Sequence, residues 1–140
     1  MRTRFFKGIL AVTAVASMAL VPATARAAEV QCRVPFSFSV NEKALPAGAY
    51  TVSTEGSLHS VLLVRGLESG AFVVASPLES RTVIGAKLVF DKYGDEYVLR
   101  QVWTGDGSGR ELPRSSVERA LMEKAARDEA AVQRVVVPAL

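Results

Sequence analysis

Residues 87–103 read KLVFDKYGDEYVLRQVW, a pattern typical of a β-hairpin. Leu88 and Phe90 lie at alternate positions on the first arm, and Gly94 provides the permissive backbone that a tight turn needs. The returning arm has no purely polar face, because apolar side chains occur on both of its faces. We therefore expect this hairpin to belong to a layered or closed sheet.

Further segments upstream have the composition of β-strands. Residues 30–40 alternate between apolar and polar, and Pro35, which cannot donate a backbone hydrogen bond, predicts a sheet edge or a bulge there. A Leu-Pro-Ala-Gly turn follows at residues 45–48. The remaining strand candidates are residues 49–54, 60–65, 71–75 and, as a short bridging strand, 82–84. Residues 60–65 and 71–75 are apolar on both faces, which favours cover on both sides.

The carboxy-terminal region has the pattern of a single helix. Ser115 and Glu118 have the spacing of a capping box, and the chain from there to about Arg134 is rich in helix-forming residues. Lys124 and Asp128 interrupt its apolar stripe, which predicts weak docking on the sheet. Residues 135–138 are expected to form a frayed tail. The predicted fold is therefore mainly β, a small antiparallel barrel or sandwich of about six or seven strands with one C-terminal helix.

The amino-terminal residues have the pattern of a cleavable signal peptide. A positive end with Arg2, Arg4 and Lys7 precedes an apolar run at residues 9–21. Pro22 ends this run, and small residues follow at positions 23–28, which predicts cleavage after Ala27, with cleavage after Ala25 or Ala28 as alternatives. A membrane-spanning helix is the weaker interpretation, since it needs about 20 apolar residues. We expect a signal peptide at residues 1–27 and one extracytoplasmic domain, periplasmic or secreted, at residues 28–140.

This prediction changes the charge balance of the domain. The whole chain has 17 basic and 14 acidic residues, but Arg2, Arg4, Lys7 and Arg26 lie in the predicted signal peptide. The remaining domain has 13 basic and 14 acidic residues, a net charge of −1. We therefore expect no nucleic-acid partner and no stable membrane anchor after cleavage.

Residues for catalysis or metal binding are scarce. Cys32 is the only cysteine, so no intrachain disulfide is expected, and a small buried hydrophobe is favoured over an intermolecular bridge or a reactive thiol. His59 is the only histidine and is interpreted as a partly exposed turn residue rather than a base paired with Cys32. A structural zinc site needs about four such ligands. No catalytic, cofactor or metal site is predicted.

Two turn motifs contain residue types that occur in ligand sites. The acidic residues near the turns are interpreted as solvated turn acids rather than calcium ligands: Asp91, Asp95, Glu96 and Asp106. Glycines 105, 107 and 109 do not lead directly into a helix, so they are interpreted as a loop rather than a phosphate cradle.

One group of side chains is a candidate binding site for a small ligand or a partner protein. It combines aromatic rings with arginines around the final hairpin: Tyr93, Tyr97, Arg100, Trp103 and Arg110, with Arg114 nearby. Such residues bind sugars, carboxylates or proteins, but they also pack across strands. Cross-strand packing is the alternative interpretation.

Five segments together resemble an uncharacterised family of small exported bacterial proteins. They are VPFSF at residues 34–38, LPAGAYTV at 45–52, KLVFDKYGD at 87–95, QVWT at 101–104 and GRELP at 109–113. The resemblance spans nearly all of the predicted domain and implies export and a single compact domain, but it supplies no site residues. Asp91 departs from it, because the family has a histidine there, which makes a metal or acid–base role at this position less favoured.

These observations favour a non-catalytic exported module that binds a partner protein or a small ligand. The alternative is a small extracytoplasmic hydrolase. An apolar pocket inside the sheet would favour ligand carriage, whereas carboxylates converging in a cleft would favour an enzyme.

Overall fold

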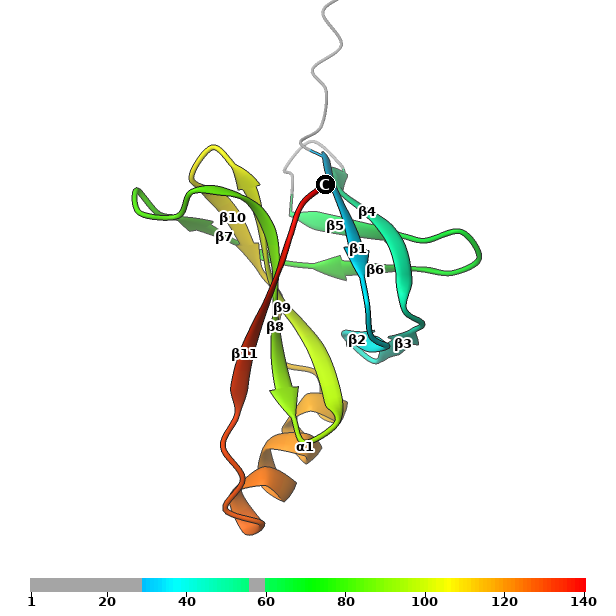
Figure 1. The fold of residues 1–140 in the computed structure, drawn as a ribbon, viewed down its shortest axis with the longest axis vertical. Coiled ribbons are helices and arrows are strands. Elements are labelled where there is room, and N and C mark those ends of the chain that lie inside the picture. Colours follow the sequence, from blue (N-terminus) through cyan, green and yellow to red (C-terminus); the bar gives the residue numbers. More distant parts are fainter. Residues whose placement is uncertain (1–28, 56–59) are drawn as a thin grey trace, which may run out of the picture.

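The computed structural model describes residues 29–55 and 60–140, which form two mainly antiparallel sheets and one helix (Figure 1). His59 lies outside the described residues. The first sheet has four strands in the order β1-β4-β5-β6. Their bounds are Glu29–Val34 for β1, Gly48–Glu55 for β4, Val61–Arg65 for β5 and Gly70–Val74 for β6.

The second sheet is built around the β8–β9 hairpin and runs in the order β11-β8-β9-β10-β7. A small β2–β3 hairpin joins it, since β2 pairs in parallel with β9 at Ser39 and Val98. The bounds are Phe38–Val40 for β2, Lys43–Leu45 for β3, Ser76–Glu79 for β7, Gly85–Tyr93 for β8, Glu96–Gly105 for β9, Ser108–Glu111 for β10 and Gln133–Pro138 for β11.

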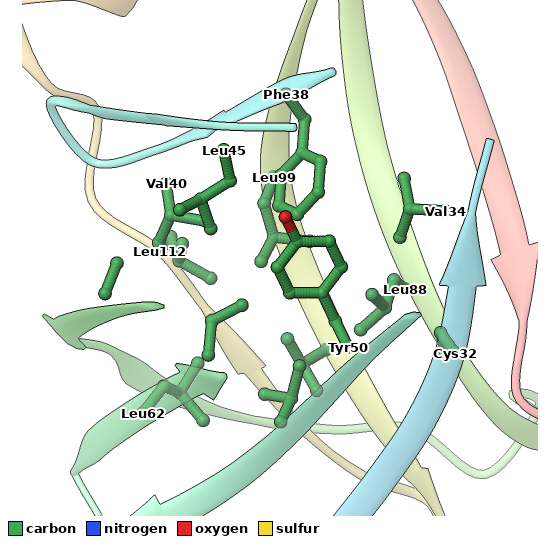
Figure 2. Packing of buried hydrophobic residues seen from close by; sticks show 14 of the residues in the cluster. Cys32, Val34, Phe38, Val40, Leu45, Tyr50, Leu62, Leu88, Leu99 and Leu112 are labelled. Atoms are coloured by element: carbon green, nitrogen blue, oxygen red, sulfur yellow. The ribbon is translucent and has the colours of Figure 1, made fainter. Parts of the chain in front are cut away.

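The two sheets enclose one hydrophobic core. Its buried side chains come from both sheets and from the β2–β3 hairpin, and Figure 2 shows several of them facing one another: Cys32, Val34, Phe38, Val40, Leu45, Tyr50, Leu62, Leu88, Leu99 and Leu112. Phe38 lies between the rings of Tyr50 and Phe90, with edge-to-face contacts at 5.0 and 5.2 Å between ring centroids. The core explains why β1 alternates strictly between buried and exposed residues.

Two connections bring the sheets together into a curled half-barrel. At one side the backbone N–H of Leu140 donates to the Gln31 carbonyl (2.8 Å), so the C-terminus lies beside β1 (Figure 1). At the other side the chain passes directly from β6 in the first sheet to β7 in the second. The buried side chain of Ala75 lies at this crossing point.

Helix α1, Ser116–Arg127, lies at the end of the β8–β9 hairpin, away from the first sheet (Figure 1). Ser115 is its N-cap, and the Ser115 hydroxyl accepts a hydrogen bond from the backbone N–H of Glu118 (3.1 Å). The carboxylate of Glu118 does not complete the capping box; it contacts Arg100 and Tyr93 on the sheet. After α1 the chain returns as β11 beside β8.

The structure confirms a mainly β fold with a single C-terminal helix, and it corrects several details of the sequence prediction. Pro35 lies between β1 and β2, so residues 30–40 form two strands rather than one. Residues 82–84 are not a strand, and the helix ends at Arg127 rather than near Arg134. The expected frayed tail at residues 135–138 is instead part of β11, because pairing with β8 buries Val137. The described chain has eleven strands, since short turns divide several of the expected segments.

Candidate functional site: a buried ionic network and an open strand edge

Arg100, on β9, is at the centre of a buried ionic network. Its side chain is only 4% exposed and binds acceptors from three directions. The guanidinium Nε donates to Asp91 Oδ2 on β8 (3.3 Å), Nη1 donates to the Leu112 carbonyl (2.7 Å), and Nη2 donates to Glu118 Oε1 on α1. The planar fork of an arginine matches such divergent acceptors, which a lysine ammonium does not.

The two carboxylates have further partners of their own. The Tyr93 hydroxyl donates to Glu118 Oε1 (2.9 Å), and Glu118 is 1% exposed. Asp91 Oδ1 lies 3.5 Å from Nε of Arg134, an exposed residue on β11. Across the described residues, no buried side-chain polar atom lacks a hydrogen-bond partner. The network therefore ties β8, β9, β11 and α1 together with its charges compensated.

The apolar contact between α1 and the sheet is small by comparison. Ala125 packs with Tyr93 and Val98, and Leu121 and Met122 are partly buried against them. Burial also raises the pKa of the Tyr93 hydroxyl; the Asp91 charge raises it further, whereas Arg100 and Arg114 act in the opposite direction. Tyr93 therefore stays protonated and can donate to Glu118 at neutral pH.

The structure places the five candidate binding residues in different surroundings. Tyr93 and Arg100 belong to the buried network. Tyr97 stacks on Phe36, with ring centroids 3.8 Å apart, and Lys92 lies over the Tyr97 ring at 5.5 Å. Trp103 and Arg110 lie on neighbouring strands at the other end of β9.

Trp103 packs against the backbone of β10. It is 6% exposed, and its indole N–H donates to Gln101 Oε1 (3.1 Å). A Cβ at Gly109 would lie 2.7 Å from the ring, so the absent side chain of Gly109 makes room for the indole. Arg110 Nη1 donates to the Gly109 carbonyl (2.7 Å). The candidate residues therefore do not share one cleft, and cross-strand packing accounts for Trp103.

Cys32 is fully buried on β1. Burial raises the pKa of its thiol to about 11, despite an opposing hydrogen bond from the Leu88 backbone. Because the thiolate is the nucleophilic form, this cysteine is unreactive at neutral pH.

The turn carboxylates also have local partners. Asp106 Oδ1 accepts from the Thr104 hydroxyl (2.6 Å) and the Ser108 N–H (2.9 Å), and these bonds hold its pKa below the ordinary range. Among residues 29–55 and 60–140, no three His, Cys, Asp or Glu side chains are grouped closely enough to hold a metal ion. Within the same residues, no helix combines the length and apolar character needed to cross a membrane.

Several hollows open on the described surface. One of about 280 Å³ lies between the β8–β9 turn and α1, and one of about 200 Å³ lies beside Tyr50 and Leu67. Another, of about 520 Å³, lies between the β2–β3 turn and the start of β6, and we call it the β6 groove. Its lining residues are Val40, Asn41, Glu42, Lys43, Gly70, Ala71 and Phe72.

The outer face of the first sheet exposes apolar side chains next to this groove. Phe72 and Val74 on β6 are 68% and 65% exposed, although both are large hydrophobic residues. They pair in register with Leu63 and Val61 on β5, so the four side chains lie on one face. We call Val61, Leu63, Phe72 and Val74 the β6 patch. The expectation that residues 71–75 are covered on both faces was therefore wrong, because only Ala71, Val73 and Ala75 face the core.

No protein-family model matches the chain, and neither the curated proteins nor the solved structures compared with it contain a match.

Proposed function

We propose that this protein is an exported, non-catalytic module that binds a partner protein through β6. The observation that carries the proposal is the exposure of Phe72 and Val74 on a strand at the edge of its sheet. Exposed apolar side chains grouped beside an unpaired strand edge are typical of protein-interaction surfaces. The amino-terminal pattern of residues 1–27 and the resemblance to small exported bacterial proteins support an extracytoplasmic location.

The interior favours a protein partner over an enclosed small ligand. Buried side chains from both sheets pack into one hydrophobic cluster between them, part of which is shown in Figure 2. The two buried carboxylates, Asp91 and Glu118, converge on Arg100 rather than on a cleft, so they serve the docking of α1. These features favour binding of a partner at the outer surface over binding of a ligand in the interior.

Chemical crosslinking in the cell envelope tests this function. Affinity-tagged wild-type chain is compared with Phe72→Ser/Val74→Thr, in which the β6 patch is made polar, and with Ile84→Thr, which changes an 89% exposed apolar residue away from β6. We expect wild type and Ile84→Thr to capture the same partner and the double variant to lose it. Equal capture by all three, or capture by none, would contradict the proposal.

Export is tested separately by the intact mass of the protein recovered from the envelope. Removal of residues 1–27 is the expected result. Retention of all 140 residues in a membrane fraction would overturn it.

A further inference from the structure

The outer edge of β6 presents backbone groups to solvent in a defined pattern. Across from β5, the N–H of Ala75 donates to the Ser60 carbonyl (2.8 Å). Hydrogen-bonded and non-bonded residue pairs alternate in an antiparallel ladder, so this bond fixes the direction of every backbone group along β6. The register then directs the N–H and C=O groups of three residues away from β5: Gly70, Phe72 and Val74.

One end of this edge is marked by positive charge. The Lys43 ammonium donates to the Gly70 carbonyl (2.6 Å), which agrees with the outward direction of that carbonyl. Arg65, on β5, pairs with Gly70 and is exposed on the same face as the β6 patch. None of the ion pairs in the described part of the chain involves Lys43 or Arg65.

The acidic neighbours form no ion pair with these two cations in the described residues. Glu42 lines the β6 groove beside Lys43, but its carboxylate accepts a hydrogen bond from Ser116 Oγ at the start of α1 (2.5 Å). Glu68 lies in the exposed loop between β5 and β6. The edge therefore combines two cations that lack an ion-pair partner in the described residues, Lys43 and Arg65, with the apolar side chains of Phe72 and Val74.

We propose that β6 binds an extended acidic segment of the partner as an added strand. The carboxylate of the segment lies opposite Gly70, and its apolar side chains, at alternate positions, lie opposite Phe72 and Val74. This inference rests on the proposed partner-binding function and names the chemistry of the bound segment.

The spacing of β-strands fits this arrangement. Neighbouring strands are about 4.8 Å apart, so a residue added opposite Gly70 lies about 10 Å from the backbone of Arg65. Gly70 has no side chain to separate them, and an extended arginine and a glutamate together span that distance. Lys43 approaches the same position from the β6 groove. Strand addition then supplies main-chain hydrogen bonds to the bound segment. The charges of Lys43 and Arg65 and the β6 patch supply specificity.

A peptide titration tests the inference directly. The probes are the capped peptide Ser-Glu-Thr-Val-Thr-Val-Ser, the same peptide with Lys in place of Glu, and both sequences in reverse order to cover parallel and antiparallel addition. Binding to the folded domain, residues 28–140, is followed by backbone amide NMR shifts. We expect a Glu peptide to shift the amides of β6 and to bind at least ten-fold more tightly than its Lys counterpart.

Two variants separate charge from backbone recognition. In Lys43→Glu/Arg65→Glu the preference should reverse toward the Lys peptide, since both changes are at exposed positions that leave the core intact. Val74→Pro removes an outward N–H without touching the ladder to β5, so it should abolish peptide binding while the melting temperature stays close to that of wild type. Val74→Thr, which keeps the N–H but makes the side chain polar, is the matched comparison and should weaken binding far less than Val74→Pro.

Other outcomes would overturn the inference. Equal binding of the Glu and Lys peptides, or shifts outside β6, would exclude this recognition mode. Cosedimentation with phosphatidylglycerol vesicles that depends on Lys43 and Arg65, without peptide binding, would assign the surface to an anionic membrane instead. If partner capture in the envelope still depends on Phe72 and Val74 while none of the peptides binds, the inference of an acidic segment is wrong and the partner-binding function stands.

Discussion

Arg100 lies on a strand whose two faces are both buried, and this is why a charged residue is found there. The side chain cannot reach water, so its charge must be compensated by Asp91 and Glu118. The sequence pattern predicted Arg100 as a candidate binding residue, because an arginine beside aromatic rings is typical of a binding site. Only the three-dimensional structure shows that one of its partners, Glu118, comes from a helix and lies eighteen residues later in the chain.

Replacing Arg100 with methionine should destabilise the protein strongly. The substitution leaves Glu118 buried without a cation and Asp91 with only the exposed Arg134, and the expected loss in the free energy of unfolding is about 3–5 kcal/mol. Urea unfolding followed by circular dichroism measures it.

Arg119→Met is the control, since Arg119 is exposed on α1, and its effect should stay within about 0.5 kcal/mol. Adding Glu118→Gln to Arg100→Met should recover part of the loss, because one of the unpaired charges is removed. Similar effects of Arg100→Met and Arg119→Met would show that the network contributes little to stability.

The Cys32 thiol should make stability depend on alkaline pH. Its pKa is raised to about 11 in the folded protein from 9.0, so the folded state keeps the proton after the unfolded chain has lost it. This contribution to the free energy of unfolding is fully present below pH 9. About 2 kcal/mol of it is lost as the pH rises toward 11.

Unfolding free energies across this range, compared with those of Cys32→Ala, isolate the contribution of the thiol from that of Tyr93, whose pKa is also raised. The alkaline decline should be shallower in Cys32→Ala. Identical slopes in the two proteins would contradict the burial of an ionisable thiol at this position.

At the scale of elements, local sequence patterns predicted where strands form better than they predicted which strands pair with each other. The β8–β9 hairpin was predicted from alternation and Gly94, which has a φ of 61° in the structure. The short alternation of residues 30–40 did not reveal the break at Pro35, and β11 was missed because a run of three valines has neither turn signals nor alternation. Its strand conformation depends on pairing with β8, which is a long-range contact.

The face that each element buries was harder to predict. Two apolar residues of α1, Val117 and Ala120, are exposed, whereas the charged Glu118 is buried. Glu118 faces the sheet because Arg100 lies opposite, and no helical periodicity of hydrophobic residues reports that. In the same way, β6 is apolar on both faces, so its sequence does not reveal that one face lacks cover.

Removing β11 should prevent cooperative folding. Deletion of residues 133–140 leaves β8 without one neighbour and removes the buried Val137 from the core. We expect a broad, non-cooperative thermal transition and binding of a hydrophobic dye.

Deletion of Leu140 alone is the control. Its side chain is 81% exposed, and the deletion removes one backbone hydrogen bond to Gln31, so the loss should be about 1 kcal/mol. A sharp transition for the 133–140 deletion would show that β11 is dispensable.

At the scale of the whole molecule, the two ends of the half-barrel differ in how their charged and apolar groups are partnered. The ionic network and α1 stabilise the end of the β8–β9 hairpin, where the charged groups are compensated. The first sheet instead ends in β6, with exposed apolar side chains and two cations without ion-pair partners in the described residues. This separation supports the proposal that the protein is a scaffold stabilised at one end and binding a partner at the other.

The most direct test of this account is photocrosslinking from single positions in living cells. A photoreactive phenylalanine analogue replaces Phe72 in one strain and the exposed Ile84, away from β6, in another. The account predicts a discrete covalent adduct with a partner protein from position 72 and none from position 84. Absence of an adduct at position 72, or the same adducts from both positions, would contradict β6 as the binding surface.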